Sequence, residues 1–186
     1  MRGYLYCCYF CGKPLFKTSF VCEKCFVIPK LKTRQQGCLK HVYLFEYNKY
    51  GEVFVKNFKY GKFENVLESL ACRYVSNAST VIAMPNSKNL IRENNHSYAL
   101  AKKIFSEQEI FEPFYKISPK QSLLAKKDRG KIELLLLEKI DLIEPIILVD
   151  DLVTSGGTLE TAWRLLGKPN ASLLSLCYTP TGSKLL

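Results

Sequence analysis

The sequence predicts an α/β fold in which helices flank an open parallel sheet, preceded by a small cysteine-rich element. Apolar runs typical of buried strands alternate with stretches whose apolar residues recur at helical spacing. The N-terminal part carries paired cysteines instead. The 186 residues, 47% of them apolar, are enough for one main domain with a small appendage. We therefore predict an N-terminal element over residues 1–36 and a sheet domain over residues 37–186.

The N-terminal element contains two Cys-x2-Cys pairs within CCYFCGKPLFKTSFVCEKC, residues 7–25. Two residues between cysteines allow a tight turn to direct both sulfurs at one ion, which is typical of a tetrahedral structural zinc site. Such a site supplies the folding free energy that so short a segment cannot gain from burial, and it leaves no open position for catalysis. Cys7 is the alternative to Cys8, at a less common spacing. The predicted ligands are Cys8, Cys11, Cys22 and Cys25.

The first half of the sheet domain shows six segments in chain order. They are a strand, a segment that suits a helix or a second strand, a helix, a strand ended by a proline, a polar loop and another helix. These segments are residues 41–48, 51–61, 63–75, 79–85, 86–89 and 96–107.

The second half continues the alternation of strands and helices. It contains a short strand, a helix start with a basic turn, a segment ambiguous between helix and strand, a clearly buried strand, a helix closed by Gly167 and a final apolar strand. These segments are residues 114–117, 118–130, 132–144, 145–151, 156–167 and 171–179.

The sequence shows no apolar stretch long enough to cross a membrane and no secretory signal at its start. We therefore expect a soluble, cytoplasmic protein. In that reducing compartment clustered thiols favour metal ligation over disulfides. Three further cysteines have no partner at metal-ligand spacing and are interpreted as core or free thiols. They are Cys38, Cys72 and Cys177.

Positive charge and aromatic residues are concentrated in residues 1–62. This segment has a net charge of +9 out of +10 and holds fourteen of the 23 aromatic residues. Lysines that follow phosphates and aromatic rings that stack on bases are typical of a surface for single-stranded nucleic acid. The alternative is that the aromatic residues build a small core and the lysines solvate it. The candidate DNA contacts are Lys56, Phe58, Lys59, Tyr60 and Lys62.

Two adjacent carboxylates end the clearest strand, in IILVDDLVTSGGTL at residues 146–159. Ligands of open parallel sheets bind beyond the carboxyl ends of the strands, so Asp150 and Asp151 are expected at the edge of such a site, presented to the ligand. The following loop enters a helix N-terminus, whose N–H groups and dipole favour a phosphate. Acids beside a phosphate site suit the hydroxyls of a ribose 5-phosphate. The loop residues are Thr154, Ser155, Gly156, Gly157 and Thr158.

The stretch 146–159 resembles the phosphoribosyl pyrophosphate (PRPP) binding motif of the type I phosphoribosyltransferases. Together with the four cysteines, FKYGK at 58–62 and VIAMPNSKNLIRENNHSYALAKKI at 81–104, it is similar to the ComF competence-protein family over nearly the whole chain. The resemblance implies a type I phosphoribosyltransferase-like domain and magnesium held by Asp150 or Asp151, directly or through water. It also implies a pyrophosphate loop formed by Asn86, Ser87, Lys88 and Asn89.

The chain departs from the family where Arg-Gly-Phe-Asn-Gln is usual. Here RENNH keeps Arg92 and Asn95 only, and a later Gln and Arg pattern is kept at Gln121 and Arg129 without the Asn that commonly follows. His96 is interpreted as a polar residue at a helix start. No residue set identifies an acceptor substrate, so binding of PRPP is predicted more firmly than its turnover.

Two functions follow from these observations. In the first, the protein is a DNA-uptake factor of natural transformation that binds single-stranded DNA and carries a PRPP and magnesium site. The resemblance implies contact with DNA-uptake machinery at the inner face of the cytoplasmic membrane. In the second, it is an active phosphoribosyltransferase of nucleotide salvage, with the N-terminal segment serving oligomerisation or stability. The charge asymmetry and the resemblance favour the first.

Overall fold

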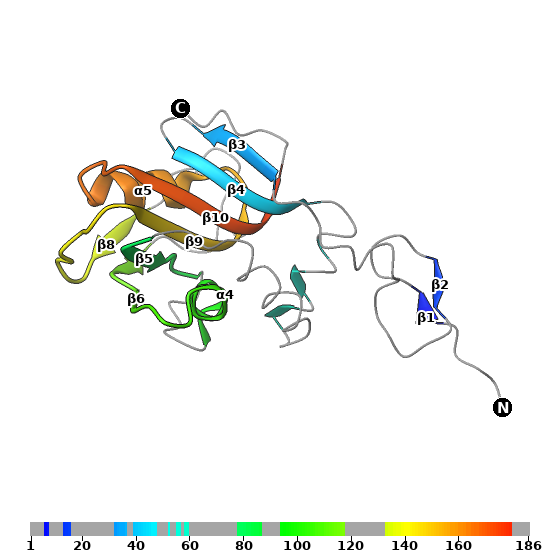
Figure 1. Ribbon diagram of the computed structural model, residues 1–186. Coiled ribbons are helices and arrows are strands. Elements are labelled where there is room, and N and C mark those ends of the chain that lie inside the picture. Colours follow the sequence, from blue (N-terminus) through cyan, green and yellow to red (C-terminus); the bar gives the residue numbers. More distant parts are fainter. Residues whose placement is uncertain are drawn as a thin grey trace.

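The computed structural model describes ten parts of the chain (Figure 1). Residues outside these parts include several of the predicted site residues. The described parts are residues 6–7, 13–15, 32–36, 39–47, 52, 55–56, 58–59, 78–86, 94–117 and 133–179.

A six-stranded, largely parallel sheet forms the centre of the fold. Four neighbouring pairs are parallel, and the first strand pairs antiparallel with the second. This sheet confirms the predicted open α/β architecture. In spatial order the strands are β3 (Lys32–Gln36), β4 (Leu39–Glu46), β10 (Ala171–Tyr178), β9 (Ile146–Val153), β5 (Thr80–Ala83) and β6 (Ile110–Phe111).

Helices cover both faces of this sheet (Figure 1). Along β9, Ile147 and Val149 pack with residues of α4 (His96–Ile104), whereas Ile146 and Leu148 pack with residues of α5 (Gly157–Leu165). Successive side chains of a strand point to opposite faces, so the two helices lie on opposite sides. Burial on both faces explains why the sequence of β9 begins as a continuous apolar run.

Two short antiparallel pairs accompany the sheet. β7 (Phe114–Lys116) pairs with β8 (Leu134–Leu136), and β1 (Tyr6–Cys7) pairs with β2 (Pro14–Leu15). The ambiguous segment 132–144 therefore contains a short strand followed by chain without regular structure. Within 51–61, the described residues are helical, which favours the helix of the two interpretations.

The predicted strands that correspond to β4, β5, β7, β9 and β10, and the predicted helices that correspond to α4 and α5, are confirmed. β3 and β6 were not predicted. β3 has the polar sequence KTRQQ and owes its conformation to pairing with β4, so the predicted boundary between residues 36 and 37 falls within this hairpin. Segments 63–75 and 118–130 lie outside the described residues. No helix in the described parts is long and apolar enough to span a membrane.

Candidate functional site

The acids Asp150 and Asp151 lie where β9 outlasts one of its neighbours. β9 continues beside β10 to Val153, but its register with β5 ends at the pair Ala83 and Val149. β5 ends at Ala83, and the Met84 N–H still donates to Val149 O at 2.9 Å, so the backbone contact with β5 stops one residue before the first acid. The acids lie within β9, in agreement with the predicted strand 145–151, and they line a space beside the end of β5.

This space is a cavity of about 380 Å³, which we call the β9–α5 cavity. It brings together five of the predicted ligand-binding residues, from two separate stretches of the chain: Asn86, Asp150, Asp151, Thr154 and Thr158. The lining also includes residues that were not assigned to ligand binding: Lys59, Pro85, Asn94, His96, Lys116 and Leu152. Ser155, Gly156 and Gly157 adjoin it along the chain. Ser87, Lys88 and Asn89 lie outside the described residues.

Asp150 is fixed by two hydrogen bonds to its Oδ1 atom. The hydroxyl of Ser97 in α4 donates one at 3.2 Å, and the backbone N–H of Asp151 donates the other at 2.9 Å. Burial, followed by the neighbouring charge of Asp151, raises the pKa of Asp150 well above its usual value. Asp150 is therefore protonated more easily than an ordinary aspartate.

Asp151 forms an ion pair with Lys59, whose Nζ lies 2.8 Å from Asp151 Oδ2. The contact neutralises charge, but it is not aligned as a hydrogen bond. Among the described residues, Oδ2 consequently has no hydrogen-bond donor although the atom is buried. A buried carboxylate oxygen in this condition favours a ligand that brings a donor or a cation.

The loop after β9 leads directly into the N-terminus of α5. Gly156 precedes the helix with φ of 77°, in the left-handed region that glycine adopts without strain. No side chain caps this helix end. Its first N–H groups therefore remain available to an anion, next to Thr154 and Thr158 in the cavity.

Asn95, which lies between two residues of the cavity lining, connects three segments of the chain and is 1% exposed. Its Oδ1 accepts the backbone N–H of Ser97 at 3.1 Å and so caps α4. Its Nδ2 donates to Met84 O at 3.1 Å and to Glu112 Oε1 at 2.8 Å. Asn95 thus fixes the end of β5 relative to the helix that holds Asp150. This role of Asn95 was not predicted from the sequence.

Besides Lys59, two titratable groups of the lining were not predicted to act there. His96 begins α4, in agreement with its interpretation as a residue at a helix start. Burial and then Lys59 lower the pKa of His96, while Asp151 raises it. Lys116 reaches the cavity from β7, and burial lowers its pKa against the charge of Asp150. No sequence signal marks Lys116, because only the folded chain brings β7 to this cavity.

The described candidates for DNA contact differ in their surroundings. Phe58 is 8% exposed and belongs to the core cluster on the α4 side of the sheet, so its ring cannot stack on a base. Its position agrees with the alternative that aromatic residues of this segment build a core. Lys56 is 65% exposed and pairs with Glu52, and Lys59 pairs with Asp151. Tyr60 and Lys62 lie outside the described residues.

The predicted zinc ligands Cys8, Cys11, Cys22 and Cys25 lie outside the described residues. The first cysteine pair lies in the chain between β1 and β2. In the parts that the structure describes, no group of three His, Cys, Asp or Glu side chains is arranged to hold a metal. Cys177 is a buried thiol, and burial, followed by the charge of Asp151, raises its pKa to about 12. Cys38 and Cys72 lie outside the described residues.

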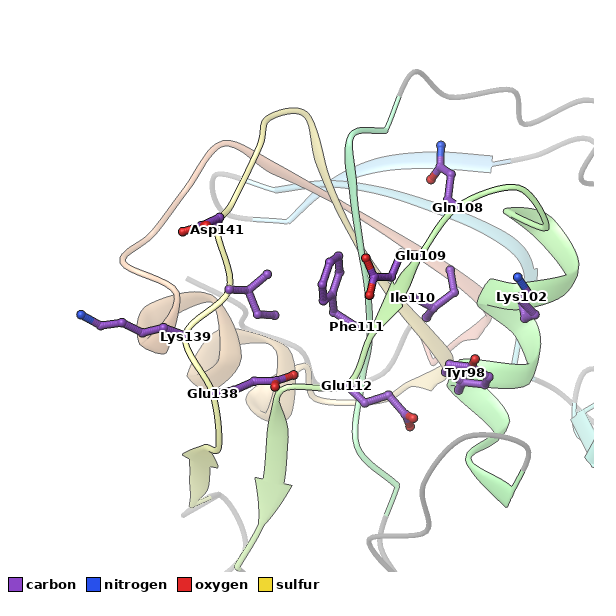
Figure 2. Close-up of a pocket in the computed structure, with 11 residues that line it drawn as sticks. Tyr98, Lys102, Gln108, Glu109, Ile110, Phe111, Glu112, Glu138, Lys139 and Asp141 are labelled. Atoms are coloured by element: carbon purple, nitrogen blue, oxygen red, sulfur yellow. The ribbon is translucent and has the colours of Figure 1, made fainter.

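A second cavity, of about 770 Å³, lies beside the edge strand β6 (Figure 2). It contains none of the predicted ligand-binding residues. Its walls come from α4, from β6 and from the chain after β8, and include Tyr98, Lys102, Phe111, Glu138 and Asp141. The chemistry predicted for the acids and the phosphate loop therefore belongs to the smaller cavity.

The chain matches no protein-family model and no curated protein. The fold and the site define an α/β protein with a cavity at the carboxyl edge of a largely parallel sheet, lined by two acids, two lysines and the N-terminus of a helix.

Proposed function

We propose that the protein is a DNA-uptake factor of the ComF kind, which binds PRPP with magnesium in the β9–α5 cavity. The observation that carries the proposal is that Asp150, Asp151 and the uncapped N-terminus of α5 open into one cavity. These features suit the two ends of a phosphorylated ribose. The molecule would belong to the type I phosphoribosyltransferase-like proteins.

The ribose end of the ligand would lie at the acids. Vicinal hydroxyls of a ribose are hydrogen-bond donors, and Asp151 Oδ2 is a buried acceptor without a donor among the described residues. The 5-phosphate would lie at α5, where backbone N–H groups and the hydroxyls of Thr154 and Thr158 are suitable donors. The diphosphate would lie towards Asn86 at the start of the proposed pyrophosphate loop.

Magnesium fits the chemistry of this cavity. It prefers oxygen ligands and keeps several waters, so carboxylate oxygens and ligand phosphates together are suitable partners. Burial, followed by the charge of Asp151, raises the pKa of Asp150, and a divalent cation would relieve the repulsion between the two acids. When bound, the ion would neutralise the charge on the diphosphate, while Asp150 and Asp151 would hold it directly or through water.

The proposed role in DNA uptake rests on the charge of residues 1–62 and on the resemblance to the ComF proteins. The exposed Lys56 supports it, because a solvated lysine can release counterions from phosphates. With Phe58 in the core, the proposed DNA contact by the described candidates is electrostatic. Zinc on the four N-terminal cysteines would stabilise the element that precedes the sheet.

An active phosphoribosyltransferase is the second candidate. His96 and Lys116 favour it, since both line the cavity beside the acids with lowered pKa values, as groups that exchange protons often do. Such an enzyme would transfer the ribosyl group to an acceptor and release pyrophosphate.

Two measurements test these proposals. Calorimetric titration with PRPP, ribose 5-phosphate and pyrophosphate, each with magnesium, should show the tightest binding for PRPP, because only PRPP occupies both ends of the cavity. Absence of PRPP binding would remove both candidates. Release of pyrophosphate is then followed with free bases and with single-stranded DNA. Turnover with a base would favour the enzyme, and binding without turnover would favour the uptake factor.

A further inference from the structure

Lys59 belongs to both of the binding sites proposed above. It belongs to the basic segment proposed to contact DNA, yet its Nζ lies 2.8 Å from Asp151 Oδ2 in the β9–α5 cavity. The Lys59 side chain is 38% exposed and that of Asp151 is 15% exposed. The lysine therefore reaches from solvent to a largely buried acid at the proposed ribose position.

A ligand at the acids would compete with this lysine. Magnesium near Asp151 repels an ammonium group, and a ribose hydroxyl that donates to Oδ2 needs the place that Lys59 Nζ occupies. The ion pair, which is not aligned as a hydrogen bond, is the weaker of these contacts for Oδ2. Binding of PRPP with magnesium should consequently release Lys59 from Asp151.

A released Lys59 would share a helical face with Lys56. The two residues are three apart in a helical part of the chain, which places their side chains next to each other. Lys56 pairs with Glu52, but both side chains are exposed, so the pair is screened and competes weakly with a polyanion. Release of Lys59 would therefore complete a two-lysine contact for the phosphates of a nucleic acid.

We propose that Lys59 couples the two sites, so that PRPP with magnesium at Asp151 frees it to bind single-stranded DNA. The inference rests on the proposed function and assigns a regulation to its site. Coupling between two ligands is reciprocal, so single-stranded DNA raises the affinity for PRPP by the same factor. Simple repulsion between the anionic ligand and DNA predicts the opposite sign, which makes the sign informative.

The test is fluorescence anisotropy of a labelled oligothymidylate at fixed ionic strength and magnesium, with and without saturating PRPP. The wild-type Kd for DNA should fall about fivefold or more when PRPP is present, within the usual range of coupling between sites. Inorganic pyrophosphate at equal ionic strength serves as the control ligand, because it lacks the ribose.

Two variants should remove the coupling in opposite ways. Lys59→Met keeps the length of the side chain without the charge, so DNA binding should be weak with or without PRPP, while PRPP binding is kept or improved. Asp151→Asn leaves Lys59 without its partner, so DNA binding should be tight even without PRPP. Lys56→Met, on the same helical segment but away from Asp151, should weaken DNA binding and keep the dependence on PRPP. Thermal unfolding of each variant verifies its fold.

The outcomes separate the inference from the function on which it rests. If PRPP and DNA both bind but neither affects the other, the coupling is wrong and the proposed function stands. If Lys59→Met loses PRPP affinity, Lys59 contacts the ligand and the coupling is wrong. If the wild type binds PRPP but no DNA, the uptake function and the coupling both fail and the enzyme remains. If it does not bind PRPP, all three proposals fail.

Discussion

Ser97 in the first turn of α4 donates a hydrogen bond of 3.2 Å to Asp150 Oδ1 in β9, two elements whose nearest ends lie 42 residues apart in the chain. This contact fixes the first acid of the cavity while the second acid, Asp151, holds Lys59. The two neighbouring carboxylates therefore have different tasks. Asp150 stabilises the fold and also lines the site. The Oδ2 atom of Asp151, in contrast, can exchange Lys59 for a ligand.

Replacement of both acids should abolish the response to PRPP. A ligand that binds only the folded state raises the melting temperature by mass action, and PRPP with magnesium should do so for the wild type. Asp150→Ala with Asp151→Ala removes the acceptors for the ribose hydroxyls, so the shift should disappear in thermal unfolding. The matched control is Glu138→Ala with Asp141→Ala, which removes two acids from the β6 cavity. An undiminished shift in the first variant would place the ligand elsewhere.

Asn95→Ala should destabilise the fold by about 2–4 kcal/mol, as measured by urea unfolding. The change removes a helix cap and leaves the buried Met84 O without its side-chain donor. Asn94→Ala is the control, because Asn94 is exposed and its loss should change the free energy of unfolding by less than about 0.5 kcal/mol. Equal effects of the two changes would contradict the role of Asn95.

The sequence was sufficient for those parts of the fold that local pattern determines. β9 and β10 are covered on both faces and so read as apolar runs, and the acids with their Thr, Ser and Gly loop lie together in the chain. Pairing partners could not be read in this way. The polar β3 is a strand because β4 lies beside it, and Lys59 and Lys116 reach the cavity only through tertiary packing. The sequence showed that Phe58 belongs to an aromatic-rich segment, but not that its ring is buried in the core.

Acidification should destabilise the fold through the buried His41. Ser175 Oγ donates to Cys177 O at 3.0 Å, so the contact of 2.9 Å with His41 requires Nε2 of the histidine to carry the proton. Burial, followed by the charge of Arg34, lowers the pKa of His41 to about 4. The unfolded chain, with a histidine pKa near 6.5, binds this proton first as the pH falls. Stability should therefore be lost between about pH 6.5 and 4, by up to about 3 kcal/mol.

His41→Gln tests this assignment, because the amide nitrogen of glutamine lies near the position of the histidine Nε2 and can still donate to Ser175, but it does not titrate. Urea unfolding of the two proteins at several pH values between about 7 and 4 gives the difference in slope. The variant should be less stable than the wild type near neutral pH and should lose less of its stability on acidification. Parallel pH profiles for the two proteins would show that His41 does not account for the dependence.

Replacement of Cys22 should remove zinc and leave the sheet folded. We predict one zinc per chain on Cys8, Cys11, Cys22 and Cys25, and a closed four-sulfur site does not hold its metal well with three ligands. Elemental analysis of purified Cys22→Ala should show substoichiometric zinc, while its thermal transition in the sheet domain stays close to that of the wild type. Cys7→Ala should retain the metal. If Cys7→Ala loses zinc and Cys8→Ala retains it, Cys7 is the better assignment for the ligand.

DNA binding should depend on salt and on lysine charge rather than on Phe58. Each lysine that neutralises a phosphate of a single strand contributes roughly −0.7 to the slope of log K against log salt. The slope should therefore become less steep by roughly 0.7 in Lys56→Glu. Lys139→Glu, on the wall of the β6 cavity, is the matched control and should leave the slope unchanged.

Phe58→Ala should cost about 3–5 kcal/mol of folding stability because its ring is buried in the core. Its folded fraction should bind DNA as the wild type does. A wild type that fails to retain a short oligonucleotide at physiological salt, where non-specific Kd values are about 10⁻⁴ to 10⁻⁶ M, would leave the phosphoribosyltransferase as the better proposal.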